Sequence, residues 1–364
     1  MVATLLFVVL ILFAGLWPFD PWPENRVMPL DGGKGLHFAG EGLVLSEGRE
    51  AETIRSLFQD RAITMELWVK PTGDVPGAVS GILAFYDSRN GKSFFVGQWR
   101  SHLLVRTQTS HPARANRNYR EIGLRDGLNT EDTSFITITS DMAGTRIYGE
   151  GVLVRAYSNY NVFPESATFE QVLVGNTPAG KQGWTGDFFG LGLYRRSLTS
   201  EEVLESCTRW KDGTRSSLSL PGTVAMYCFQ EPARRFVRNC AAENLHLLIP
   251  ERFVPPRKIM LSRSREHLMH GWSSLQDVLI NIAGFVPLGF LLCAFLRTNY
   301  TWNSISACLI TVAAAAFLSL SVEFLQAWFP SRDSSLADLA FNTLGGVLGG
   351  VAALLLPGRK ITSL

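Results

Sequence analysis

Charged residues and cysteines are scarce in this sequence. Charged residues make up 18% of the 364 residues, against about 25% in soluble domains, and five residues are cysteine. So few cysteines exclude a small domain held together by a disulfide framework. The net charge of +2 gives no overall basic field, so we predict no nucleic-acid partner. The mean hydropathy of +0.11 excludes a disordered chain and disfavours a wholly soluble one.

Motifs for metal binding and covalent catalysis are also missing. The sequence has no CxxC pair and no His/Cys cluster, so we predict no metal site and no cofactor. No GxSxG segment marks a nucleophilic serine. A glycosidase needs two carboxylates across a cleft, but Glu66 is the only acid in its predicted strand, and Asp60 and Asp74 lie too far along the chain to share its face. We therefore expect the middle of the chain to bind rather than catalyse.

Long apolar runs lie at both ends of the chain. They cover residues 2–17, 278–296, 304–322 and 336–356. A membrane-spanning helix needs about 17–25 apolar residues, so we predict four transmembrane helices. The first run is the shortest, and a cleaved signal peptide is its alternative. No Lys or Arg precedes that run, and bulky residues beginning at Trp17 replace a small-residue cleavage site, which favours a membrane anchor.

The intervening region has short alternating runs of apolar and polar residues between Gly, Asn, Asp and Pro turns. This pattern predicts a β-sandwich. The dipeptide Asn90-Gly91 favours a tight hairpin between two of the strands, and Thr199 followed by Glu202 marks the start of a helix. We divide the chain into a first transmembrane helix at 1–22, a β-sandwich at 31–250, a basic membrane-proximal linker at 251–277 and three transmembrane helices at 278–358.

Several segments of the sandwich region resemble the concanavalin A-like, laminin-G-like jelly roll. The matching segments are Gly-Leu-His-Phe-Ala-Gly at 35–40, the strand at 64–71, and Trp-Thr-Gly-Asp-Phe-Phe-Gly at 184–190, which leads into 193–202. The resemblance implies a binding module of the kind typically found outside the cell, with an envelope glycan as its expected partner. Calcium occurs in this fold class, but no calcium ligand set can be read in the sequence.

The candidate ligand-binding residues of this region are aromatic or basic. They are Trp99, Arg117, Tyr119, Arg120 and Trp184. Aromatic rings stack on sugars, and an Arg-rich segment suits an acidic polymer. The alternative is that the aromatic rings belong to the sandwich core and that the Arg-rich segment is an ordinary solvated loop.

Two cysteines of the sandwich region are disulfide candidates. Cys228 and Cys240 could close a small loop in an oxidising compartment, which would leave Cys207 over.

Polar residues gather at the ends of the last three apolar runs. They are Asp277, Asn281, Glu323, Gln326, Arg332, Asp333, Asp338 and Asn342. A chain that crosses a membrane and returns places the start of one helix and the end of the next at the same face, and the link to the last helix is short. We therefore expect all eight side chains at one membrane interface. Asp277/Asn281 and Asp338/Asn342 have i, i+4 spacing, which puts each pair on one helix face.

Ionisable groups at membrane depth are costly and face a partner or a polar cavity. Arg332 could pair with Glu323 or Asp338. The alternative is ordinary helix-end chemistry, since carboxylates near a helix start are favourable.

The ordered set of these residues resembles the VanZ-like membrane family. The pattern is Asp277-x3-Asn281-x3-Phe285-x-Pro287-x-Gly289, then Glu323-x2-Gln326, then Arg332-Asp333-x4-Asp338-x3-Asn342-x2-Gly345. The segment from Leu16 to Asp20 fits the end of the family's first helix. The resemblance implies that the jelly roll is inserted between the first and second helices of one membrane unit. It brings no reaction, and it links the chain to glycopeptide antibiotic tolerance only through the family's name.

The sidedness follows from basic residues. Arg297, Arg359 and Lys360 share one face, which the positive-inside tendency assigns to the cytoplasm. The jelly roll then lies on the extracytoplasmic side of the bacterial cytoplasmic membrane. The basic linker, with Arg257, Lys258, Arg263 and Arg265, argues for the opposite side, unless it contacts anionic headgroups or a polyanionic glycan.

Three hypotheses follow. The first is an envelope protein whose exported jelly roll binds an envelope glycan or a surface partner and whose polar cluster forms a site at the outer interface. Its expected partners are membrane lipid and an envelope glycan or lipid-linked glycan. The second is a membrane enzyme acting on a lipid-linked envelope substrate, with Glu323 or Asp338 as the acid/base and Arg332 holding an anionic headgroup. The third is a purely structural cluster. The oligomeric state cannot be read from the sequence.

Overall fold

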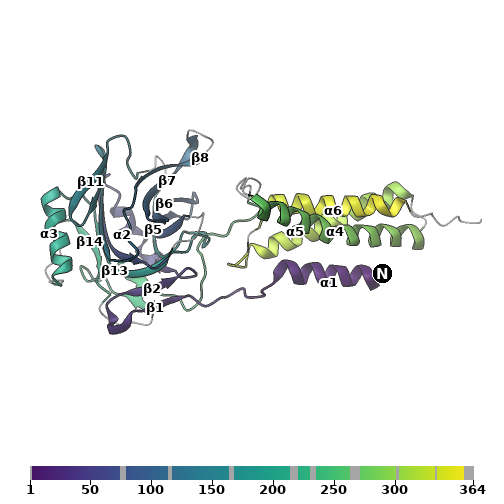
Figure 1. The fold of residues 1–364 in the computed structure, drawn as a ribbon, viewed down its shortest axis with the longest axis horizontal. Helices are drawn as coiled ribbons and strands as arrows, with labels where there is room; N and C mark the ends of the chain where they lie inside the picture. The colour runs from purple at the N-terminus through teal and green to yellow at the C-terminus, as the bar shows by residue number, and fades with distance from the viewer. Residues whose placement is uncertain are drawn as a thin grey trace, which may run out of the picture. The chain divides into compact units, whose positions relative to one another are not determined.

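The computed structural model describes residues 2–73, 79–113, 117–163, 168–213, 220–229, 235–262, 271–300, 303–332 and 334–355. Contacts within the chain divide it into two compact units. One unit is Pro23–Arg257, and the other joins Met1–Trp22 to Lys258–Leu364. The first is built of strands and the second of helices (Figure 1).

The strand unit is a sandwich of two antiparallel sheets, which confirms the predicted fold class. The first sheet has the order β1 (Val27–Pro29), β2 (Leu36–Ala39), β13 (Thr185–Tyr194), β4 (Ile63–Pro71), β9 (Ser134–Asp141), β10 (Gly144–Gly149) and β11 (Val152–Tyr157), with β14 (Thr223–Tyr227) paired to β13. The second has the order β15 (Phe236–Val237), β16 (Leu247–Leu248), β3 (Val44–Ser46), β12 (Gln171–Val174), β5 (Ser80–Asp87), β6 (Lys92–Trp99), β7 (His102–Ala113) and β8 (Arg117–Leu124). Short helical turns lie at η1 (Asp31–Gly33), η2 (Gly48–Glu50) and α2 (Ala51–Ser56).

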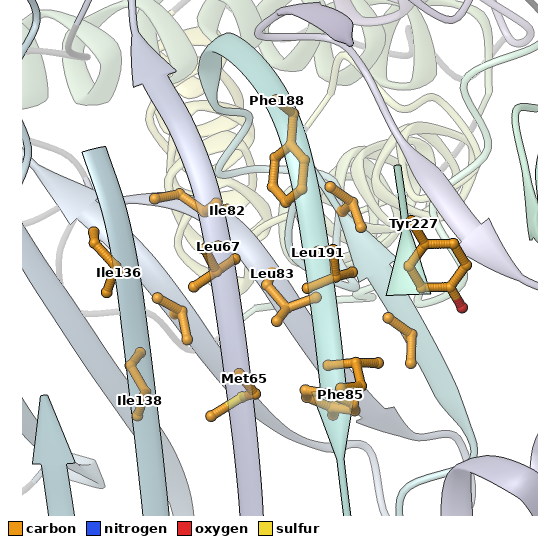
Figure 2. Close-up of a cluster of buried hydrophobic side chains, with 14 of the residues drawn as sticks. Met65, Leu67, Ile82, Leu83, Phe85, Ile136, Ile138, Phe188, Leu191 and Tyr227 are labelled. Carbon is orange, nitrogen blue, oxygen red and sulfur yellow. The ribbon is translucent and has the colours of Figure 1, made fainter. Parts of the chain in front are cut away.

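Alternation along the strands builds the core between the sheets. In β4, Met65 and Leu67 point into the core, where they lie near Ile136 and Ile138 of β9 (Figure 2). Phe85 of β5 comes from the opposite sheet. Because side chains alternate between the two faces of a strand, the intervening residues of β4 face the other way, toward helix α3.

Helix α3 (Ser200–Lys211) covers the outer face of the first sheet. It begins where the sequence predicts, because Thr199 accepts from the backbone N–H of Glu202 and the Glu202 carboxylate accepts from the backbone N–H of Thr199. Under this helix, Glu66 of β4 accepts hydrogen bonds from the Tyr194 hydroxyl (2.8 Å) and the Trp210 indole N–H (2.9 Å). Glu66, isolated in sequence, is therefore a buried anchor for α3.

The predicted tight hairpin joins β5 to β6 through Asn90-Gly91. Gly91 has a φ of 63°, a left-handed conformation that glycine adopts without strain. The Asp87 carboxylate accepts from the backbone N–H groups of Arg89 (3.0 Å) and Asn90 (3.1 Å), which fixes the turn.

The helical unit contains α1 (Val2–Leu16), α4 (Gly271–Asn299), α5 (Ser304–Gln326) and α6 (Leu336–Leu354). Three segments of the described chain are long and apolar enough to cross a membrane, namely Leu275–Asn299, Ser304–Gln326 and Leu336–Leu354. Large apolar side chains such as Phe317, which is 73% exposed, lie on their outer faces. A surface of this kind suits lipid rather than water.

The first predicted span is shorter in the structure than expected. Helix α1 has 15 residues, or about 22 Å of helix, against about 30 Å for the hydrocarbon core of a bilayer. It packs against α4 and α5 (Figure 1), with Phe7 and Ile11 lying against Phe285 and Leu288. The structure therefore contains three full-length spans and one shorter apolar helix that packs against two of them.

Glycines bring α6 close to its neighbours. Toward α4, a Cβ atom on Gly345 would lie 2.3 Å from the Ile282 carbonyl oxygen, and one on Gly349 would lie 2.0 Å from the Val286 carbonyl oxygen. Toward α5, a Cβ atom on Gly346 would lie 2.5 Å from the Ala315 Cβ. Only glycine permits this backbone approach, which is the typical packing of small residues between membrane helices.

Candidate functional site

A polar cavity of about 430 Å³ lies at one end of the helical unit. The helices alternate in direction, so α1 and α5 end there while α4 and α6 begin there. The cavity is lined by seven of the eight polar residues that the sequence analysis groups together, which are Asp277, Asn281, Glu323, Gln326, Arg332, Asp338 and Asn342. The eighth, Asp333, lies outside the described residues.

Glu323 joins the end of α5 to the start of α6. The side chain is 1% exposed, and its Oε2 accepts a 2.6 Å hydrogen bond from the backbone N–H of Ser335. Ser335 in turn caps α6, because its hydroxyl accepts from the backbone N–H of Ala337. A carboxylate at a helix N-terminus is stabilised by the unpaired N–H groups and the helix dipole.

Two side-chain amides make hydrogen bonds between α6 and the helices α4 and α5. The Asn281 side chain of α4 donates to Oδ1 of Asp338 at 2.8 Å. One turn further along α6, the Asn342 side chain donates to the Ser319 hydroxyl of α5 at 3.0 Å. Asp338 and Asn342, which have i, i+4 spacing on α6, thus form hydrogen bonds with two different helices.

Arg332 and Gln326 meet the end of α1. The Gln326 side chain donates to the Gly15 carbonyl at 2.7 Å, and the Arg332 guanidinium donates to the same oxygen at 2.9 Å and to the Ala14 carbonyl at 3.4 Å. The last carbonyls of a helix lack intrahelical partners, and a cation there complements the dipole. The sequence suggested Glu323 or Asp338 as partners of Arg332, and did not foresee these backbone acceptors.

One acceptor in the cavity is unused. Gln326 is 7% exposed, and its Oε1 accepts no hydrogen bond from the part of the chain that the structure describes. Its Nε2 faces the Gly15 carbonyl, which can only accept, so the orientation of the amide follows from the geometry.

The segment before α4 reinforces the cavity wall. Ser262 forms a parallel bridge with Ser335, and the Leu261 N–H donates to the Ser334 hydroxyl at 3.0 Å. In the predicted basic linker, the Lys258 ammonium lies 3.4 Å from the centre of the Trp328 ring. These serines carry no motif, so the sequence could not single them out. Arg263 and Arg265 lie outside the described residues.

The sugar-binding candidates of the sandwich differ in how deeply they are buried. Trp184 is fully buried in the core, where its indole N–H donates to the Gln98 side chain at 2.7 Å. The prediction of Trp184 as a ligand contact is therefore wrong, because the alternative of a core residue holds. Trp99 is half-buried beneath the Arg100 guanidinium, 5.0 Å from the ring centre.

Tyr119 and Arg120 lie in β8, as does Arg117. The Arg106 guanidinium stacks 4.0 Å from the centre of the half-buried Tyr119 ring. Arg120 is exposed and donates to the Asn159 carbonyl at 2.6 Å. The side chain of Arg117 lies outside the described part of the structure.

The structure shows the five cysteines as thiols. Cys228 is buried and Cys240 is exposed, and a disulfide between them stays a prediction. Among the described residues, no three His, Cys, Asp or Glu side chains are grouped so that they could hold a metal ion.

Comparisons with known proteins give two family matches. The VanZ/LLP1 family matches residues 222–357, and the concanavalin A-like lectin/glucanases superfamily matches residues 46–204. No curated protein matches the sequence.

Some solved structures are similar to about half of the chain at low sequence identity. The sialidase CBM40 of Ruminococcus gnavus, bound to alpha2,3 sialyllactose, is 12% identical with a TM-score of 0.37, over 50% of this chain and 96% of its own. The receptor binding domain of botulinum neurotoxin C/D mosaic serotype is 12% identical with a TM-score of 0.40, over 51% of this chain and 45% of its own. The two family matches show that the chain joins a VanZ-like membrane region to a concanavalin A-like β-sandwich.

Proposed function

We propose that this chain is a bacterial envelope protein whose polar cavity binds the headgroup of a membrane-face molecule and whose exported β-sandwich binds an envelope glycan. The observation that carries the cavity's role is that Gln326, which lines the cavity together with the buried Glu323, has a buried Oε1 that accepts no hydrogen bond from the described residues. Polar groups buried in a membrane bundle are costly unless they are paired or used. The cavity lies at the helix ends, which is the level of lipid headgroups.

The position of Arg297 supports an extracytoplasmic cavity. Its guanidinium donates to the Ala353 carbonyl near the end of α6 at 2.6 Å, so it marks the end of the bundle opposite to the cavity. The positive-inside tendency places that end in the cytoplasm.

The glycan-binding role rests on the superfamily match of residues 46–204 and on the stack of Arg106 on Tyr119. The Arg106 guanidinium is also paired with the Glu121 carboxylate at 2.6 Å, so this pair offers a sugar an aromatic ring held in place and no free charge. A link to glycopeptide tolerance rests on the VanZ resemblance alone.

The binding role is tested by the full-length protein in nanodiscs of mixed bacterial lipids. Native mass spectrometry measures the lipids that stay bound after release. We expect wild type to retain lipid and Glu323→Gln to lose it, with both proteins folded by circular dichroism. Ser321→Ala is the matched control, because the half-buried Ser321 of α5 is not among the cavity-lining residues and, among the described contacts, bonds only its own helix at Phe317.

The other hypotheses give different results in the same experiment. A purely structural cluster predicts that Glu323→Gln loses folded protein rather than lipid. An enzyme using Glu323 or Asp338 predicts that wild type, and not Glu323→Gln, converts the retained lipid to a product of different mass. Equal lipid retention by wild type and folded Glu323→Gln contradicts the proposed binding role.

A further inference from the structure

The cavity offers more acceptors than donors. Three carboxylates line it, those of Asp277, Glu323 and Asp338, against the single guanidinium of Arg332 among the described lining residues. The Arg332 guanidinium already donates to the carbonyls at the end of α1. The lining therefore favours a ligand that carries positive charge.

The amides of the lining also turn their donors toward the protein. Asn281 donates to Asp338, Asn342 donates to Ser319, and Gln326 donates to Gly15. Each of these bonds fixes the amide nitrogen against another element of the bundle. The Gln326 oxygen, which has no partner among the described residues, is then the amide atom that remains for a ligand, and an amide oxygen only accepts.

Gln326 gives a second observation that is independent of charge. Gln326 is a lining residue of the cavity, and its buried Oε1 accepts no hydrogen bond from the described residues. A buried acceptor without a donor is unfavourable, and a ligand N–H aimed at it would remove that cost.

We propose that the cavity binds a primary ammonium group, carried by an aminophospholipid headgroup or by an amino sugar. This inference rests on the proposed headgroup-binding role and names the chemical class of the ligand. A primary ammonium has a full positive charge for the carboxylates and three N–H donors, enough to reach a carboxylate and the Gln326 oxygen together. A quaternary ammonium has the charge but no N–H donor, and an anionic headgroup is repelled by the carboxylates.

The test compares matched probes on the full-length protein in detergent micelles. The lipid probes are phosphatidylethanolamine, phosphatidylcholine and phosphatidylglycerol with identical acyl chains. The sugar probes are glucosamine and N-acetylglucosamine, which differ in having an ammonium or an acetamide group. The shift of the thermal unfolding midpoint with probe concentration gives the apparent affinity, because a ligand that binds the folded state stabilises it.

We expect phosphatidylethanolamine or glucosamine to bind roughly tenfold tighter than its partner without a primary ammonium, which is the effect of about one charge-assisted hydrogen bond. The probe that shows the preference identifies the source of the ammonium. Asp338→Asn keeps the oxygen that accepts from Asn281 and removes the charge, so the preference should fall while the protein stays folded. Gln326→Met should weaken the same preference, and Ser321→Ala should leave it intact.

Two results overturn the inference. If phosphatidylglycerol binds best and Glu323→Gln or Gln326→Met changes its binding, the cavity is a headgroup site but not one for ammonium groups. If no probe binds in a way that the cavity variants change, the ammonium inference and the headgroup-binding role both fail.

Discussion

The side-chain amide nitrogen of Asn281 lies 2.8 Å from Oδ1 of Asp338, although 57 residues separate them in the chain. This bond joins the first turns of the membrane-spanning parts of α4 and α6 at the cavity. Further into the bundle, glycines take over the contact between the same two helices. The α4–α6 interface thus has a polar end that forms the cavity wall and a close-packed apolar remainder.

Asn281 and Asp338 should therefore be energetically coupled. We expect a double-mutant cycle of Asn281→Ala and Asp338→Ala to give a coupling free energy of about 1 kcal/mol, the size found for hydrogen bonds between membrane helices. Reversible unfolding in mixed detergent micelles measures it. Asn281→Ala combined with Ser321→Ala should be additive, because Ser321 lies on another helix, α5, where its hydroxyl donates to the Phe317 carbonyl of that same helix. Additivity of the Asn281 and Asp338 variants would show that their bond does not stabilise the fold.

Gly349 should not tolerate even a methyl group. A Cβ there would lie 2.0 Å from the Val286 carbonyl oxygen and 2.6 Å from the Phe290 backbone nitrogen. Since these are backbone atoms, α4 and α6 would have to separate, and we expect Gly349→Ala to cost about 1–3 kcal/mol of unfolding free energy. Gly284→Ala is the control, because a Cβ there meets no atom within 4 Å. Equal stability of the two variants would contradict the close approach of α4 and α6.

The sequence predicted which residues line the cavity better than it predicted the hydrogen bonds between them. The alternation of helix direction was enough to bring Asn281, Glu323 and Asp338 to one end, because it depends only on where the apolar runs begin and end. The hydrogen bond from Arg332 to the Gly15 carbonyl could not be predicted, since this acceptor is a backbone group and every residue has one.

In the sandwich, alternation predicted the strands but not which aromatic rings are buried. Trp184 lies in the segment that carried the jelly-roll resemblance, and its indole is held by Gln98, 86 residues away. The partners of Glu66 are equally distant, with Tyr194 at 128 and Trp210 at 144 residues. Only the pairing of strands in space brings such residues together.

Cys240 offers a test of sidedness. It is exposed, whereas Cys207, Cys228 and Cys293 are buried. In the Cys308→Ser variant, we expect a membrane-impermeant maleimide to label Cys240 in intact spheroplasts, because the proposal places the sandwich outside. Cys240→Ser should abolish the labelling. Labelling that needs prior reduction by an impermeant phosphine would reveal the predicted bond to Cys228, and labelling only after lysis would place the sandwich in the cytoplasm.

Glu66 should make the sandwich less stable as the pH rises. Burial raises the pKa of its carboxyl above the usual value, although hydrogen bonds from Trp210 and Tyr194 oppose the shift. Between the unfolded pKa, about 4.5, and the raised folded pKa, the folded state holds a proton that the unfolded state has lost. The contribution of Glu66 to the free energy of unfolding is therefore greatest below this window and declines across it toward neutral pH.

Other carboxyls have the opposite dependence, so the effect of Glu66 must be isolated as a difference. The ion pair with Arg196 lowers the pKa of Glu202, and the stability that this pair provides is lost as the pH falls through that lowered value. Denaturation of the full-length protein, followed by tryptophan fluorescence from pH 4 to 8, compares wild type with Glu66→Gln. We expect the advantage of wild type over Glu66→Gln to shrink as the pH rises, because glutamine does not titrate. The same comparison for Glu131→Gln, at an exposed position, should show no such trend. A constant difference for Glu66→Gln would mean that Glu66 stays ionised beneath α3 throughout the range.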